Sequence, residues 1–171
     1  MTADVIYHGN RDHRRAGPAP IAIETPAGEV TGLLHNHARG KSPDGFAWSY
    51  GGSGPAATAK SLLIDALGDR AKCHTCAGTQ QIVYGSPSTL TARPFDPARD
   101  AALPGNPDED GYEGPARFDC PDCDDGYRRL PYQDFKAAFV ATWGDEFRIS
   151  RREILTWLID HHPGCLTGSE G

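Results

Sequence analysis

The sequence has no run of about 18 apolar residues, the length that a helix needs to cross a membrane. Residues 1–10 lack the basic start and the apolar stretch of a secretory signal peptide. Hydrophobic residues make up only 38% of the 171 residues. We therefore expect no membrane span, a small core, and a cytoplasmic location in which thiols stay reduced.

A catalytic set of nucleophile and base is also missing from the sequence. The nearest motif is Gly54–Ser61, which matches the phosphate-binding pattern G-x-x-x-x-G-K-[ST] except at Ala59. Pro55 has no N–H for a phosphate, and a helical pattern already runs through Ala59. We therefore expect a protein that is not an enzyme.

The start of the same helix leaves one alternative open. Free N–H groups around Ser53 and Gly54 can hold one anion. A small enzyme could combine that anion site with His35 or His37 as its base. These two histidines share one face if the segment is a strand, so one metal ion could also reach both.

Two C-x-x-C pairs carry the clearest chemical signal: Cys73 with Cys76, and Cys120 with Cys123. Each pair fits one tight turn that presents both sulfurs to one ion, and two such turns complete a tetrahedron. The pattern predicts one structural Zn²⁺ held by these four cysteines. All four ligands are protein atoms, so no coordination position stays open for a substrate.

Glycine follows each pair, as Gly78 and Gly126, and supplies the positive φ that such turns need. Residues 77–119 separate the pairs, so the metal would close a long loop. By analogy with zinc-finger peptides, it would contribute about 10 kcal/mol to folding. Two alternatives stay open: a redox-active C-x-x-C, expected at a strand-to-helix junction, and two disulfides, expected in an oxidising compartment.

Glycine (20 residues) and proline (14) form about a fifth of the chain, against roughly 12% on average. This excess predicts long loops. A chain of this length suits one domain with an insertion. We assign residues 1–68 and 130–171 to an α+β core domain, and residues 69–129 to an acidic insertion that binds zinc.

Strand patterns are short. Residues 5–7 are a strand candidate, and residues 21–23 and 30–34 flank a turn sequence, which predicts a hairpin. Residues 46–50 place three aromatic side chains at a period of two and predict a half-buried strand or extended segment. In the insertion, residues 81–84 predict a strand, and residues 86–114 predict no regular structure.

Helical spacing of apolar residues is clearest over residues 55–67, with Ser53 or Gly54 as the cap and Gly68 as the end. A second helix is predicted over residues 135–143. Ser150 and Glu153 form a capping box that begins a third helix. The expected fold is α+β: a small antiparallel sheet near the N-terminus packed with three helices, and a zinc-ribbon-like insertion between the first and second helix.

Charge is unevenly placed. From Asp96 to Asp125, ten acidic residues stand against two arginines. This acidic stretch repels phosphate and makes the insertion a poor reader of nucleic acid. Nucleic-acid contact, if it occurs, is expected from arginines outside it: Arg11, Arg14, Arg15, Arg148, Arg151 and Arg152.

His161, His162 and Cys165 stand close together near the C-terminus. They could ligate a second metal ion, but the sequence offers no fourth ligand beside them. We expect an ordinary chain terminus here.

The cysteine pairs resemble the C-x-x-C-x-G-x-G repeats of J-domain co-chaperones. Gln80 stands at the final glycine of the first repeat, and Gly126 lies one position late in the second. Because only two repeats are present, the resemblance implies a two-knuckle hairpin and no chaperone function.

A second resemblance is carried by residues 42–56, SPDGFAWSYGGSGPA. They are similar to the F-x-W-G-Y-x-G-S-G-P-A motif of an uncharacterised domain family of bacteria and their phages. Ser49 stands where that family usually has glycine. The resemblance covers about residues 5–67 and 132–158. It implies a phage or mobile-element origin, hence the host cytoplasm, and no known activity.

Together these patterns predict an uncharacterised phage or mobile-element protein that acts as a non-enzymatic, zinc-stabilised binding module. A protein is the favoured partner. The alternatives are a nucleic-acid-binding accessory protein and a small enzyme with an anion site at Ser53 and Gly54.

Overall fold

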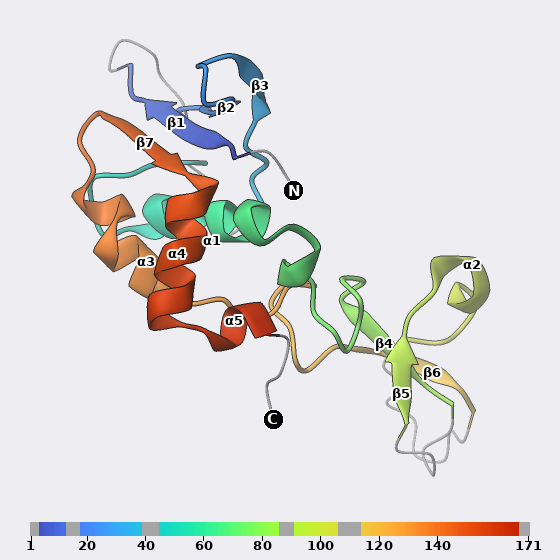
Figure 1. Ribbon diagram of the computed structural model, residues 1–171. Coiled ribbons are helices and arrows are strands. Elements are labelled where there is room, and N and C mark those ends of the chain that lie inside the picture. Colours follow the sequence, from blue (N-terminus) through green and yellow to red (C-terminus); the bar gives the residue numbers. More distant parts are fainter. Residues whose placement is uncertain (1–3, 13–17, 39–44, 86–90, 106–113, 168–171) are drawn as a thin grey trace. The chain divides into compact units, whose positions relative to one another are not determined.

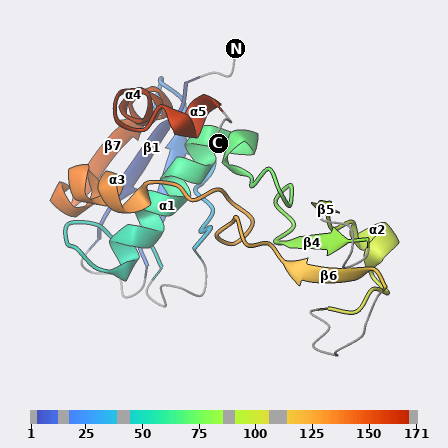
Figure 2. The same cartoon turned by 90° about the horizontal axis from the view of Figure 1, so that it is seen from below.

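The computed structural model describes residues 4–12, 18–38, 45–85, 91–105 and 114–167. The chain divides into two compact units, drawn in Figure 1 and Figure 2. Unit 1 comprises Met1–Arg70 and Leu130–Gly171, and unit 2 comprises Ala71–Arg129. Within the described ranges, no helix is both long and apolar enough to cross a membrane.

Unit 1 contains a four-stranded antiparallel sheet in the order β3-β2-β1-β7. Tyr7 of β1 lies opposite Ile23 on one side and Ile149 on the other. The predicted N-terminal strand and hairpin are thus confirmed. The strands are β1 (Ile6–Asn10), β2 (Ile21–Glu24), β3 (Val30–Leu33) and β7 (Glu146–Ser150).

Strand β7 corrects the expected sheet, which was built from N-terminal strands alone. Phe147 and Ile149 are buried, whereas Glu146 and Arg148 are exposed. This alternation is the period-two pattern of a half-buried strand, confined to five residues. The segment is short and lies directly before a strong helix start, so the helix signal obscured it.

Helices α1 (Ser53–Leu67), α3 (Tyr132–Ala138) and α4 (Arg151–His161) pack with the sheet (Figure 2). Short α5 (Gly164–Thr167) follows α4. Helix α1 is buried along most of its length, including Leu62, Leu63 and Leu67 of the predicted apolar stripe. The described residues contain five helices, including α2 in unit 2, where the sequence predicted three. The α+β class with antiparallel sheets is confirmed.

The ends of the helices confirm some expectations and correct others. Gly68 ends α1 with φ 60°, as predicted. The N-cap is Gly52 instead of Ser53 or Gly54, so Pro55 is the third helical residue. Its missing N–H costs nothing there, because first-turn N–H groups have no partner within the helix. The predicted capping box of Ser150 and Glu153 begins α4, and both of its hydrogen bonds are present.

Two segments differ from prediction. The second helix ends at Ala138, and a short 3-10 turn (Val140–Thr142) replaces its predicted continuation. The aromatic segment before α1 is no strand, because Ser49 adopts φ 74° and reverses the alternation. Trp48 is fully buried, but Tyr50 remains 47% exposed. Glycine adopts such a φ without strain, which gives a physical reason for the glycine that the similar motif carries at the position of Ser49.

Unit 2 contains a three-stranded antiparallel sheet in the order β5-β4-β6. The predicted strand over residues 81–84 is confirmed as β4. Strand β5 and helix α2 fall within residues 86–114, so the expectation of no regular structure was wrong for part of that stretch. The elements are β4 (Gln81–Tyr84), β5 (Ala92–Pro94), α2 (Pro97–Asp100) and β6 (Ala116–Asp119).

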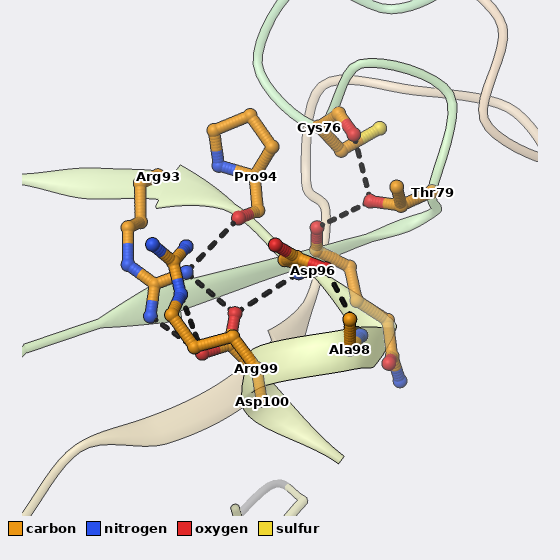
Figure 3. Close-up of polar contacts among 9 residues, drawn as sticks. Cys76, Thr79, Arg93, Pro94, Asp96, Ala98, Arg99 and Asp100 are labelled. Carbon is orange, nitrogen blue, oxygen red and sulfur yellow. Dashed lines mark hydrogen bonds and ion pairs between the residues drawn. The ribbon is translucent and has the colours of Figure 1, made fainter.

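An ion pair fastens α2 to β5 (Figure 3). Arg93 donates from both terminal nitrogens to Asp100, at 2.5 and 2.7 Å. The backbone N–H of Asp96 donates to the same carboxylate at 2.9 Å. The Arg93 guanidinium therefore holds the pKa of Asp100 well below its ordinary value. Asp96 also caps α2 through the N–H of Ala98.

The packing around Gly9 yields a stability prediction for unit 1. A Cβ at Gly9 would lie 2.2 Å from Cε1 of Phe147. Phe147 has little room to move, because it stacks on Trp143 at 3.9 Å and meets Trp48 at 5.0 Å between ring centroids. Gly9→Ala is therefore expected to lower the free energy of unfolding by about 1–3 kcal/mol, measured by urea unfolding and tryptophan fluorescence.

Gly32→Ala is the matched control for this variant. Gly32 also lies in the sheet, on β3, but its Cβ would meet nothing within 4 Å. We expect a change of less than about 0.5 kcal/mol. All three tryptophans lie in unit 1, so the fluorescence reports that unit. Similar losses in both variants would contradict the described contact.

Candidate metal centre

The four cysteine sulfurs of unit 2 converge. The Sγ atoms of Cys73, Cys76, Cys120 and Cys123 all lie within 4.8 Å of one another. The Cys73–Cys120 distance is 3.8 Å and the Cys76–Cys123 distance is 3.9 Å. In a tetrahedron with Zn–S bonds of about 2.3 Å, neighbouring sulfurs are about 3.8 Å apart. The group can therefore hold one metal ion at its centre.

The same distances argue against the disulfide alternative. A disulfide needs sulfurs about 2.05 Å apart, and none of the five cysteines forms a disulfide. The sulfurs also do not lie at a strand-to-helix junction, where a redox C-x-x-C is expected. Cys73 and Cys76 instead lie on a turn that precedes β4, and Cys120 and Cys123 on a turn that follows β6.

The two cysteine turns hold each other through their backbones. The N–H of Cys73 donates to the carbonyl of Gly126 at 2.9 Å, and the N–H of Cys120 donates to that of Gln80 at 2.8 Å. Gly78 and Gly126 adopt φ of 86° and 85°, which confirms the expected role of glycine. Gln80, at the expected final glycine of the first repeat, adopts φ 67°.

Backbone N–H groups also point at the sulfurs. Cys76 accepts from the N–H groups of Gly78 and Gln80, and Cys120 accepts from that of Asp122. Burial raises the pKa of Cys120 to about 12. At Cys76 burial also favours the neutral thiol, but the two N–H donors, together with hydrogen bonds from Cys73 and Cys120, outweigh it, and the pKa is lowered. Such donors stabilise thiolate charge and orient metal ligands.

Thr79 braces the first cysteine turn, a role that sequence reasoning missed. Its hydroxyl lies 2.7 Å from the carbonyl of Cys76 and 2.9 Å from that of Gln81 (Figure 3). The backbone N–H of Thr79 donates to the same Cys76 carbonyl at 3.0 Å. The sequence could have indicated this role, because a threonine lies three residues after the second cysteine of the pair, and short hydroxyl side chains often bond to nearby backbone groups.

The predicted anion site at the start of α1 is partly covered. A Cβ at Gly54 would meet Ala47 at 2.7 Å and the Tyr50 hydroxyl at 2.9 Å. The proposed bases lie elsewhere: the N–H of His37 donates to Ser61, about 12 Å along the helix from Ser53. The structure therefore does not bring the anion site and this histidine together.

His35 and His37 form an aromatic pair, with ring centroids 4.7 Å apart. Burial, and next the neighbouring His35, lower the pKa of His37. Among the residues that the structure describes, the two histidines belong to no group of three or more metal ligands.

The described arginines of the predicted nucleic-acid contact all have partners within unit 1. Arg11 donates to the carbonyl of Trp48 and lies over its ring. Three other arginines pair with carboxylates: Arg148 with Glu24 at 2.7 Å, Arg151 with Asp65 at 3.4 Å, and Arg152 with Asp4 at 3.7 Å. The last two of the predicted set, Arg14 and Arg15, lie outside the described residues.

The histidines near the C-terminus do not converge on a second metal site. His161 Nδ1 lies 3.0 Å from the Trp157 carbonyl, and His162 Nε2 lies 3.4 Å from Asp134. Cys165 is bound through its backbone N–H to the carbonyl of His162. In the described part of the chain, the four cysteines of unit 2 are the only group whose ligand atoms converge.

Comparison with known proteins identifies a family. Residues 7–92 match the family described as "Family of unknown function (DUF6166)". The chain belongs to this family. The DUF6166 match begins in β1, continues through α1 and the first cysteine pair, and ends in β5. No curated protein and no solved structure matches the chain. Two interpretations stay predictions: that residues 42–56 are a motif of the family, and that residues 69–129 are an insertion.

The close approach of the two cysteine turns yields a second prediction. Gly126→Ala would place a Cβ 2.5 Å from the Gly78 carbonyl oxygen at a φ of 85°. The turns must then separate, and left-handed strain adds about 1–2 kcal/mol. We expect zinc affinity to fall by at least about tenfold, measured by competition with a chromophoric chelator.

Gly28→Ala serves as the control. Gly28 has a similar φ of 87°, but nothing lies within 4 Å of its Cβ, and it belongs to unit 1. This variant carries the backbone strain without the clash, so its zinc affinity is expected to equal that of the unchanged chain. Undiminished affinity in Gly126→Ala would contradict the contact between the turns.

Proposed function

We propose that this DUF6166 protein is a non-enzymatic binding module in which one structural Zn²⁺ holds unit 2 in shape. The observation that carries the proposal is the sulfur spacing of 3.8 and 3.9 Å between the two cysteine pairs. That spacing suits a tetrahedral ion bound by four thiolates. Such a site is closed, so the ion serves structure and does not meet a substrate.

The small core of unit 2 supports a structural role for the metal. The buried cluster of this unit consists of Cys73, Cys76, Cys120 and Ile82, with Tyr84 and Phe118 packed against it. In the described part of unit 2, Ile82 and Val83 are the only fully buried apolar side chains larger than cysteine. So few apolar contacts rarely fold a segment alone, whereas a bound metal supplies folding free energy directly.

Zinc is favoured by the donor set. Soft thiolates in a tetrahedral arrangement bind zinc or iron, and hard cations such as Mg²⁺ and Ca²⁺ prefer oxygen. The four thiolates carry more negative charge than one divalent ion neutralises, so the loaded site adds about −2 to an already acidic unit. This charge disfavours phosphate and, with it, a nucleic-acid partner for unit 2.

A protein partner is supported by unit 1. Strand β3 lies at the edge of its sheet and exposes Val30 (59%) and Leu33 (65%). Exposed apolar side chains on an edge strand are typical of surfaces that pair with another polypeptide. We place the protein in the cytoplasm, and in the host cytoplasm if a phage or mobile element encodes it.

Metal analysis of the purified chain tests the proposal. We expect about one zinc and no iron per chain by elemental mass spectrometry. Cys76→Ser and Cys120→Ser should each lose most of the metal, because each removes one ligand. Cys165→Ser is the matched control, since this cysteine lies outside the cluster, and it should keep its zinc. Equal metal content in all three variants would overturn the assignment.

Removal of the metal tests its structural role. With a strong chelator, amide hydrogen exchange in β4 and β6 should accelerate, while the tryptophan fluorescence of unit 1 stays unchanged. The reason is that unit 2 loses its central contacts and unit 1 keeps its own core. Unchanged exchange in β4 and β6 after complete zinc removal would show that the metal does not hold unit 2.

A further inference from the structure

An open cavity of about 700 Å³ lies in unit 1 where the end of α1 meets the first turns of α4. All residues that line it belong to unit 1. Its volume lies within the usual range of small-molecule sites, roughly 300–1,000 Å³. The cysteine cluster does not involve this cavity, and of the site residues expected from the sequence only Arg151 and Arg152 line it, so its chemistry must be derived from its walls.

One wall of the cavity is apolar. Leu67 at the end of α1 and Leu155 and Ile159 on α4 line it. Ile159 is 55% exposed, which is unusual for a large aliphatic side chain in this chain. Leu155 and Ile159 are four residues apart and therefore share one face of α4. This wall can bury the apolar body of a ligand.

Two of the carboxylates that line the cavity, Asp65 and Asp4, are already used within unit 1, and the third, Asp69, also has a partner in the protein. Asp65 accepts a hydrogen bond of 2.5 Å from the Tyr7 hydroxyl and pairs with Arg151. Burial, and next this hydrogen bond, raise the pKa of the Tyr7 phenol, so it remains a donor. Asp4 accepts from the backbone N–H of Arg152 at 3.2 Å. These acids are thus satisfied from within unit 1.

Three arginines line the cavity beside the three aspartates, and their guanidinium donors are only partly used. Arg151 contacts the carboxylate and the carbonyl of Asp65, both at 3.4 Å, and the Tyr7 hydroxyl, but its buried Nε has no hydrogen-bond partner. The Arg152 side chain is 80% exposed and has one ion pair, at 3.7 Å. Arg70 is exposed and makes no hydrogen bond or ion pair with any described residue. A guanidinium carries five N–H donors, so each of these three arginines has donors left for a ligand.

The N-terminus of α4 does not supply the anion site. The N–H groups of Arg151, Arg152 and Glu153 donate to Val5, Asp4 and Ser150 respectively. A bound anion must therefore be held by side-chain guanidinium groups. Such groups bind phosphate and carboxylate with charge-assisted, often paired hydrogen bonds.

We propose that this cavity binds a small organic anion: an apolar body that carries one phosphate or carboxylate group. The anionic group pairs with Arg70, Arg152 and the outer N–H groups of Arg151. The apolar body lies against Leu155 and Ile159. Asp65, held by Tyr7, orients Arg151 for this contact. The site is independent of the zinc cluster, because every residue that lines it belongs to unit 1.

Three probes of similar size test the proposal on the full, zinc-loaded chain: phenyl phosphate, benzoate and benzyl alcohol. We expect phenyl phosphate or benzoate to shift backbone NMR signals of α4 and the end of α1 in a saturable manner. Benzyl alcohol should bind at least about tenfold more weakly, because it lacks the charge that the arginines recognise. Equal binding of the alcohol, or no saturable shift from either anion, would overturn the proposal.

The double variant Arg70→Gln, Arg152→Gln removes two exposed cations without breaking the partly buried pair of Arg151 and Asp65. Its anion affinity should fall by at least about tenfold, with unchanged tryptophan fluorescence. Lys136→Gln is the matched control, because it removes a cation of unit 1 on α3, which does not line the cavity. Undiminished affinity in the double variant, or an equal loss in Lys136→Gln, would refute the arginine site.

Discussion

The convergence of four sulfurs is the constraint on which unit 2 depends. Its sheet has strands of three or four residues and a buried cluster composed mostly of cysteine. Backbone hydrogen bonds run in both directions between the cysteine turns: the N–H of Cys73 donates to Gly126, and the N–H of Cys120 donates to Gln80. These bonds hold the two cysteine pairs next to each other. The backbone hydrogen bonds thus bring the four sulfurs to the distances at which they could hold one metal ion.

The parts of the fold that the sequence predicted are those with strong local signals. The apolar stripe of α1, the capping box at Ser150 and the turn between β2 and β3 each act within a few residues. Strand β7 was missed because its role depends on pairing with β1 at the other end of the chain. The segment around Trp48 was misjudged because one positive φ at Ser49 cancels a regular alternation.

The candidate metal site was more predictable than the cavity, for a chemical reason. Cysteines in C-x-x-C spacing have few uses in a reduced compartment, so their pattern alone identifies the ligands. The cavity of unit 1 joins Arg70, near the end of α1, to Arg151 and Arg152, which follow β7. No spacing rule links residues so far apart. Arg151 and Arg152 did stand out as basic, but their acidic partners Asp65 and Asp4 were visible only in three dimensions.

Strand β1 occupies an interior position of its sheet and pairs on one side with β7, which is completed only near the other end of the chain. During synthesis, β1 must therefore wait until all of unit 2 has left the ribosome before it can pair with β7. Unit 2 is continuous in sequence and is complete before β7 exists. The order of synthesis thus favours early folding of unit 2 and late folding of unit 1. Because β1 must pair with a distant strand, the folding of unit 1 is the slow step.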